Sequence, residues 1–191
     1  MRGRLGRLLG AAVLAALAGC AYEVAGRVEV MAPGRLAGVR GVAVAPFRYP
    51  NDWTGHFQDV YRRADVPPPP GRKVDLVEAT FLIEDALAAR GYPTLPWPAG
   101  EEEAPPGPPP RALLERLRGR GIEAALLVQG ESRCESLEKC AARVAMALWE
   151  TAGGALLWRA EATAATLLHQ GDEMKAAAEE ALAGLPARPG K

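Results

Sequence analysis

Hydrophobic residues along this chain occur in short runs that alternate between the period of a strand and the period of a helix. Apolar runs at 41–47 and 122–129 predict two buried strands. Alternating apolar positions at 144–149 and 156–163, separated by the turn 151–154, predict an antiparallel hairpin. A brief extended segment at 92–97, broken by prolines, predicts a short edge strand.

Three helices are predicted from apolar residues spaced three and four positions apart. The first begins at Asp75 and stops at Gly91, a residue that readily ends helices. The second begins at Pro110, and the third begins near Asp172 and stops at Pro186. The inward-facing positions of the three helices are Leu76, Ile83, Leu87, Leu113, Leu114, Leu117, Met174, Ala178, Ala181, Leu182 and Leu185.

The predicted order is β-α-β-α-β-β-β-α, in which helices separate the early strands and a meander follows. Helices between successive strands imply right-handed crossovers and a partly parallel sheet. We therefore expect an α/β fold, a single mixed β-sheet with helices packed on it, in one domain at 41–186. Proline-rich loops are expected at 66–71 and 100–110, within longer connections, and a C-terminal tail at 187–191.

The amino terminus has the three parts of an export signal. Three arginines precede an 11-residue apolar run at 8–18, which is too short for the roughly 20 residues that span a bilayer. The next residues, Leu17-Ala18-Gly19-Cys20, resemble the lipobox of bacterial lipoproteins. That resemblance implies removal of residues 1–19 as a signal peptide and lipidation of Cys20. The alternative is an ordinary secretory signal that ends near a cysteine.

Lipidation would place the protein in the cell envelope. Acyl chains on Cys20 would anchor it, and we expect residues 20–40 to be a lipidated N-terminus and tether. Ala21 and Tyr22 follow the cysteine, and the lack of an aspartate there resembles sorting to the outer membrane. The expected location is therefore the outer membrane, facing the periplasm.

Composition and charge exclude several classes of protein. The chain has 191 residues, 49% of them hydrophobic, and a mean hydropathy of −0.06, which excludes a polytopic membrane protein and a wholly disordered chain. Lys+Arg and Asp+Glu both number 23, so the net charge is 0, and loss of three arginines with residues 1–19 makes it −3. A mildly acidic surface predicts no nucleic-acid partner.

The two remaining cysteines, Cys134 and Cys140, are predicted to form a disulfide because an exported chain meets an oxidising compartment. A loop of about seven residues would stabilise the fold by roughly 2–2.5 kcal/mol. Two free thiols remain the alternative. Neither CxxC spacing nor a histidine occurs nearby, so we expect no metal site and no cofactor.

Motifs that carry catalysis do not occur in the sequence. Its two histidines, His56 and His169, are far apart, and HExxH, GxSxG, GxGxxG and Walker motifs are missing. Aromatic residues instead gather after the first predicted strand, where open α/β sheets often bind ligands. They could bind a partner, pack on the sheet as an amphipathic turn, or surround an enzymatic site at His56. The candidate partner-binding residues are Tyr49, Trp53, His56, Phe57 and Tyr61.

Four motifs resemble the CsgG-like (curli-secretion) and penicillin-binding-protein-activator lipoprotein families. They are the opening strand Val42–Phe47, the helix end Leu87–Tyr92, the strand Gly121–Gly130 and the hairpin turn Thr151–Trp158. The resemblance implies an anticodon-binding-domain-like sandwich and a non-catalytic role in envelope assembly or secretion. The chain has no spare pair of strands of 9–11 residues for a transmembrane barrel, so pore formation is not expected.

The sequence thus predicts a lipid-anchored cell-envelope protein, a non-catalytic binding or assembly module in the periplasm with an envelope protein as its partner. Two alternatives stay open. One is an envelope hydrolase or metal-dependent enzyme that uses the loop at 49–61. The other is a subunit of an oligomeric secretion complex, which would need a lateral apolar surface. An exposed apolar patch without converging polar groups would favour binding, whereas a pocket joining His56 to acids or cysteines would favour an enzyme.

Overall fold

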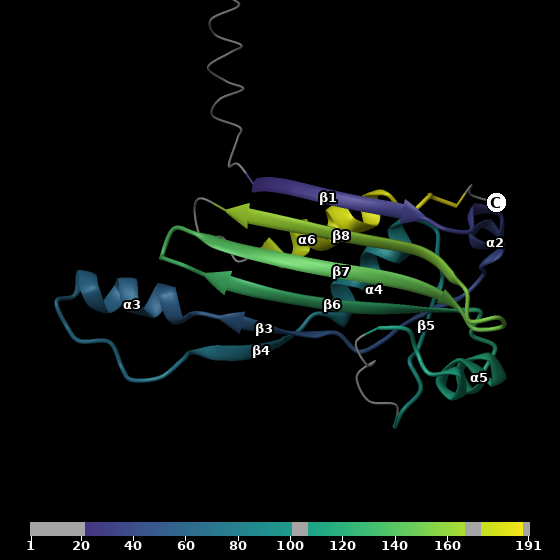
Figure 1. Ribbon diagram of the computed structural model, residues 1–191, viewed down its shortest axis with the longest axis horizontal. Helices are drawn as coiled ribbons and strands as arrows, with labels where there is room; N and C mark the ends of the chain where they lie inside the picture. The colour runs from purple at the N-terminus through teal and green to yellow at the C-terminus, as the bar shows by residue number, and fades with distance from the viewer. Residues whose placement is uncertain (1–21, 101–106, 167–172, 189–191) are drawn as a thin grey trace, which may run out of the picture.

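One mixed sheet of eight strands organises the molecule in a computed structural model that describes residues 22–100, 107–166 and 173–188 (Figure 1). The described residues also contain five helices. This architecture confirms the predicted α/β fold with a single mixed sheet. The predicted signal peptide at 1–19 and Cys20 lie outside the described residues. None of the described helices is long and apolar enough to cross a membrane.

The strands are β1 (Tyr22–Val30), β2 (Val42–Val44), β3 (Arg48–Asp52), β4 (Val74–Glu78), β5 (Thr94–Leu95), β6 (Ala124–Cys134), β7 (Cys140–Glu150) and β8 (Leu156–Thr166). The helices are α2 (Pro33–Gly38), α3 (Thr54–Arg63), α4 (Thr80–Ala89), α5 (Arg111–Gly119) and α6 (Glu173–Ala183). The predicted order β-α-β-α-β-β-β-α is present as β2-α4-β5-α5-β6-β7-β8-α6. The structure adds β1 and α2 before it, and β3, α3 and β4 within it.

Strand β6 is the centre of the sheet. Its run Ala124–Val128 is buried, as the continuous apolar sequence predicts. On one side β6, β7, β8 and β1 form an antiparallel series. On the other side β6 is shared, because its first residues pair in parallel with β2 and Ser132–Arg133 pair in parallel with β3. On this side the sheet therefore has two branches: β2–β5 lies beside the first residues of β6, and β3–β4 lies beside its last residues.

Helices cover the two faces of the sheet unequally. Helices α4 and α6 pack on one face, where Ile83, Leu87 and Leu182 join the main hydrophobic core (Figure 1). Helix α5 packs on the opposite face, where Leu113 and Leu117 contact a small apolar cluster on β2 and β6. Because α5 covers only one end of that face, none of the described helices lies over much of the surface formed by β1, β8 and β7.

The segment predicted as a tether belongs to the sheet instead. All nine residues of β1 pair with β8, and α2 follows directly, so residues 22–38 are part of the folded domain. The sequence contains a signal for this strand, since Glu23, Arg27 and Glu29 alternate with small or apolar residues at the period of two. Close packing holds the strand in place, because a Cβ added at Gly184 of the 183–185 turn would lie 2.6 Å from Val28 Cγ1.

The helix predicted from Asp75 is wrong at its start. Residues 74–78 form β4, which pairs with β3, and α4 begins at Thr80. Leu76 lies opposite Pro50 in this pair and is 71% exposed, so it does not belong to the core as predicted. The longer connection around the proline-rich loop at 66–71, predicted to lack regular structure, likewise contains β3 and the ten-residue helix α3. The later start of α4 and the strand in the expected connection both result from pairing between β3 and β4. This pairing joins residues more than twenty positions apart in the sequence.

Candidate functional site

The five aromatic and histidine positions predicted as a partner-binding loop divide into two groups in the structure. Tyr49 is buried at 8% exposure and stacks on Phe47 with ring centroids 5.7 Å apart, so it is a core residue. Burial raises the pKa of the Tyr49 hydroxyl, and the Glu173 carboxylate raises it further. The other four positions lie at and within helix α3, outside the main core.

Helix α3 begins with a cluster of rings. The ring centroids of Trp53 and His56 lie 5.4 Å apart, and those of His56 and Phe57 lie 5.8 Å apart, both edge to face. Lys73, from the segment that returns toward β4, lies over the Phe57 ring with its Nζ 5.9 Å from the centroid. The three neighbouring rings are half-buried, which fits packing within α3 as well as contact with a partner.

Two carboxylates hold α3 onto the body. Asp52, just before α3, accepts a hydrogen bond from the Thr54 backbone N–H at 3.0 Å and another from Arg72 Nε at 2.7 Å. The Thr54 hydrogen bonds, followed by the Arg72 guanidinium, lower the pKa of Asp52 to about 2. Asp52 therefore stays ionised, and its two oxygens are engaged by the Thr54 backbone N–H and by Arg72.

Asp59 makes the second attachment. Its carboxylate accepts a hydrogen bond from the Leu137 backbone N–H at 3.3 Å, and it also pairs with Arg62 and Arg63. The hydrogen bond from Arg62 and then the one from Leu137 lower the pKa of Asp59. Leu137 lies in the loop 135–139 between β6 and β7, so Asp59 joins α3 to this loop.

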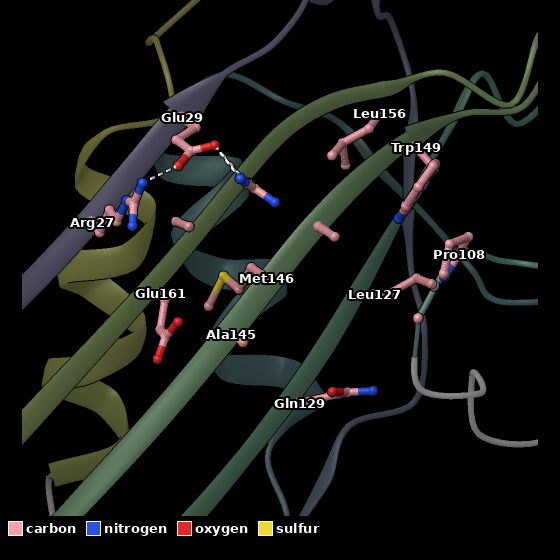
Figure 2. Close-up of a pocket in the computed structure, with 14 residues that line it drawn as sticks. Arg27, Glu29, Pro108, Leu127, Gln129, Ala145, Met146, Trp149, Leu156 and Glu161 are labelled. Carbon is pink, nitrogen blue, oxygen red and sulfur yellow. Dashed lines mark hydrogen bonds and ion pairs between the residues drawn. The ribbon is translucent and has the colours of Figure 1, made fainter.

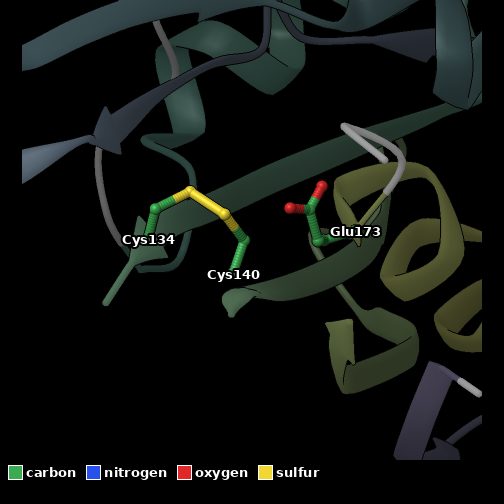
Figure 3. A group of neighbouring side chains, drawn as sticks. All are labelled: Cys134, Cys140 and Glu173. Carbon is green, nitrogen blue, oxygen red and sulfur yellow. A yellow bond between two sulfur atoms is a disulfide. The ribbon is translucent and has the colours of Figure 1, made fainter. Parts of the chain in front are cut away.

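A disulfide closes the same loop. Cys134 and Cys140 are directly opposite each other on β6 and β7, and the structure joins them by a disulfide. Figure 3 shows the buried Glu173 carboxylate on the Cys140 side of this bond, and the three side chains offer ligand atoms within 4.8 Å of one another. The two sulfurs bond to each other and are not thiolates, so this group is not a metal site in the oxidised chain.

A concavity of about 570 Å³ lies on the sheet face that lacks α4 and α6 (Figure 2). Leu127, Ala147 and Trp149 contribute apolar side chains from neighbouring strands, and Pro108 borders them. The indole N–H of Trp149 is buried, and no hydrogen-bond acceptor for it occurs in the part of the chain that the structure describes. The apolar side chains of this concavity suit ligand or partner binding.

Ion pairs border this concavity on the strands β1, β7 and β8. Glu29 pairs with Arg27 at 2.8 Å and accepts a hydrogen bond from Arg159 Nε at 2.7 Å (Figure 2). Arg143 Nε donates to Glu161 at 2.6 Å on the same side. The hydrogen bond from Arg159 lowers the pKa of Glu29, so this carboxylate stays charged.

Among the described residues, the lining of the concavity contains neither His56 nor Asp52, nor any cysteine, serine or histidine. The two carboxylates in this described lining, Glu29 and Glu161, are already paired with arginines, and no nucleophile lies beside a base among the lining residues that the structure describes. Sequence reasoning missed this surface. The available signal was the alternation of Arg27, Glu29, Arg159 and Glu161, which shows polar positions on one face of two strands.

Fold and surface together define an α/β protein with a half-covered mixed sheet and surfaces suited to binding. No protein-family model matches the chain, and no curated protein matches it. Among solved structures, it is similar to a PelC dodecamer from Paraburkholderia phytofirmans and to a single-residue variant of that dodecamer. Identity is 17% in both, the match covers 88% of this chain and 100% of the other, and the TM-scores are 0.49 and 0.48. The resemblance to CsgG-like and activator lipoproteins stays a prediction.

Proposed function

We propose that this chain is a lipid-anchored cell-envelope protein that acts as a non-catalytic binding or assembly module in the periplasm, with an envelope protein as its partner. The lipidation signal at Cys20 supports the location. One observation supports the binding role above the others: large apolar side chains stand exposed on the edge strand β4 and the start of α4.

These side chains are Val74, Leu76 and Phe81, which are 42%, 71% and 56% exposed. Val74 and Leu76 are two positions apart on β4, so they point to the same face of the strand. Among the described strands β4 pairs only with β3, which leaves its other backbone edge unpaired. An apolar surface beside an unpaired strand edge is a common site for another polypeptide.

Assembly with further copies is a second candidate function, because the opposite edge of the sheet is similar. Strand β1 pairs only with β8 among the described strands, and Val24, Val30 and Met31 near it are 38%, 39% and 53% exposed. Two different apolar edges on opposite sides allow head-to-tail contacts between subunits. This arrangement supplies the lateral surface that a subunit of an oligomeric secretion complex needs.

Site-specific crosslinking in the lipidated protein tests these proposals. A photo-crosslinking amino acid at position 76 is expected to capture an envelope protein or a second copy, whereas one at position 112, exposed on α5, is the matched control. Leu76→Asp should abolish capture by a second crosslinker at position 81 while the protein still folds. Equal capture from positions 76 and 112, with no loss in Leu76→Asp, would contradict a binding role for this edge.

Location and role are tested separately. Cys20→Ala is expected to release the protein from membranes, and a mature chain that lacks acyl mass would remove the anchor from the proposal. For the aromatic segment, Trp53→Ala provides the comparison. If every captured partner is unchanged in that variant, the partner-binding interpretation of the segment is wrong.

A further inference from the structure

The start of β1, the connection between β6 and β7, and helix α3 lie at one end of the sheet (Figure 1), and the disulfide joins the two residues that flank this connection. The strand register places them in a single row. Tyr22 on β1 pairs with Thr166, Thr166 pairs with Cys140, and Cys140 pairs with Cys134. Next to Cys134, Arg133 pairs with Asp52, the last residue of β3, and α3 follows at Thr54.

This row brings α3 close to the anchor site. Cys20 is two residues before Tyr22, so at about 3.3–3.6 Å per residue its Cα lies within roughly 7 Å of the start of β1. Four strand spacings of about 4.8 Å separate β1 from β3 along the row. The beginning of α3 is therefore about 20 Å from the start of β1 and at the same end of the sheet, so a bilayer that holds an acylated Cys20 lies next to α3.

Helix α3 turns its polar side toward the protein. A Cβ added at Gly55 would lie 2.5 Å from the Glu135 carbonyl oxygen, and Asp59 binds the Leu137 N–H, so this side of the helix packs on the disulfide loop. Phe57, Val60 and Tyr61 share the other side at helical spacing. Val60 is 37% exposed there, and Val66 just beyond the helix is 47% exposed.

Three exposed arginines lie on or near α3, and each is paired with a carboxylate: Arg62 and Arg63 with Asp59, Arg72 with Asp52, and Arg63 also with Glu138, which is 64% exposed. The side chains of Arg62, Arg63 and Arg72 are 79%, 54% and 71% exposed, and that of Asp59 is only 5% exposed. Arg62 and Arg63 follow Val60 and Tyr61 in the last turn of the helix, on the side that carries Asp59, and much of each arginine side chain is exposed. Apolar and aromatic residues flanked by arginine are the pattern of helices that lie in the headgroup region of a bilayer.

We propose that helix α3 contacts the membrane: Phe57, Val60 and Tyr61 lie at the boundary between headgroups and acyl chains, and Arg62, Arg63 and Arg72 bind lipid phosphates. The occupant is the leaflet that holds the lipid on Cys20, so this proposal depends on the proposed lipid anchor. Because the protein then contacts the bilayer at two places, through the lipid on Cys20 and through α3, the orientation of the sheet relative to the membrane is fixed. The far end of the sheet, with α5, then points away from the bilayer.

Amide hydrogen exchange on the full lipidated chain tests this orientation. The chain is reconstituted in vesicles of phosphatidylethanolamine and phosphatidylglycerol, and the acyl mass is measured in the same sample. We expect peptides over 54–66 to exchange roughly tenfold more slowly in vesicles than in the unlipidated Cys20→Ser protein, and peptides over α5 to exchange at equal rates.

A matched pair of variants makes the test specific. Val60→Glu places a charge on the outward side of α3 and should remove the slowing, whereas Ala112→Glu, at an exposed position on α5, should leave it intact. Circular dichroism confirms that both variants fold. An acylated chain whose α3 exchanges as fast in vesicles as in solution would overturn the membrane contact and leave the anchor standing. A chain without acyl mass would overturn the anchor, and this proposal with it.

Discussion

Asp59 on α3 accepts a hydrogen bond from the backbone N–H of Leu137, 78 positions later in the chain and inside a loop closed by a disulfide. This contact joins the element inserted between β3 and β4 to the central hairpin of the sheet. It makes the position of α3 depend on the shape of the 135–139 loop. Three of the predictions below test this connection or the charges that maintain it.

Loss of the disulfide is expected to lower the free energy of unfolding by roughly 2 kcal/mol, because closing a loop of about seven residues restricts the unfolded chain. Urea unfolding of the Cys134→Ala/Cys140→Ala double variant measures this loss. Dithiothreitol should lower the urea midpoint of the wild type and leave that of the double variant unchanged. Equal sensitivity to the reductant in both proteins would show that the bond does not form.

Gly55→Ala is expected to destabilise the protein by roughly 1–3 kcal/mol, because the added methyl group would overlap the backbone carbonyls of Cys134 and Glu135. Rigid backbone cannot move aside as a flexible side chain can. Gly119→Ala on α5 is the matched control, since nothing lies within 4 Å of its added Cβ. That variant should be neutral or gain about 0.5–1 kcal/mol from helix propensity. Equal effects in thermal unfolding would contradict the close packing of α3 on the disulfide loop.

Acidification is expected to weaken the attachment of α3. The folded-state pKa values of Asp52, about 2, and of Asp59 lie below their ordinary value of 3.8. Such carboxylates stabilise the fold fully above the unfolded-state pKa, and this contribution is lost as the pH falls from there toward the folded-state pKa. Urea midpoints should therefore drop between about pH 5 and about pH 2.

Substitution separates these carboxylates from the general effect of acid. Asp59→Asn should already be less stable at neutral pH and lose less on acidification than the wild type. Asp85→Asn, an exposed position on α4, should keep the pH dependence of the wild type. If Asp59→Asn and wild type give parallel curves, the Asp59 contacts do not contribute to the pH dependence.

Gly184→Ala is expected to loosen strand β1, since the added Cβ would lie within 2.7 Å of Val28 Cβ and Cγ1. We expect faster hydrogen exchange in peptides over residues 22–30 and a loss of roughly 1–3 kcal/mol. If residues 22–30 were only a tether, Gly184→Ala would change neither their exchange rates nor the free energy of unfolding. Gly34→Ala, which meets nothing within 4 Å, provides the neutral comparison.

Local patterns predicted the elements that bury one continuous apolar face. The strand at 122–129, the hairpin closed by 151–154 and the helices at Pro110 and Asp172 each keep their hydrophobic side against the same sheet. The disulfide between Cys134 and Cys140 was also predicted, from the even pair of cysteines that remains after Cys20 and from the expected export of the chain. For these elements, local periodicity and long-range packing favour the same structure.

Other elements depend on partners that local patterns do not reveal. Leu76 fits a helical face by its spacing, yet backbone pairing with β3 puts it on an edge strand at 71% exposure. Tyr49 belongs to an aromatic segment by sequence, yet on β3 it is buried in the core and stacks on Phe47. Burial of a side chain is decided by the strands and helices beside it, which lie far away in the sequence.

By itself, the amino-acid sequence determined the α/β class, the central strands, the last two helices and the cysteine pair, because each of these depends on residues close together along the chain. Only the tertiary structure decided that β1 completes the sheet, that one of its faces is half-covered, and that α3 lies at the same end of the sheet as the start of β1. These relationships arise from strand register, in which hydrogen bonds join residues such as Tyr22 and Thr166 across almost the whole domain.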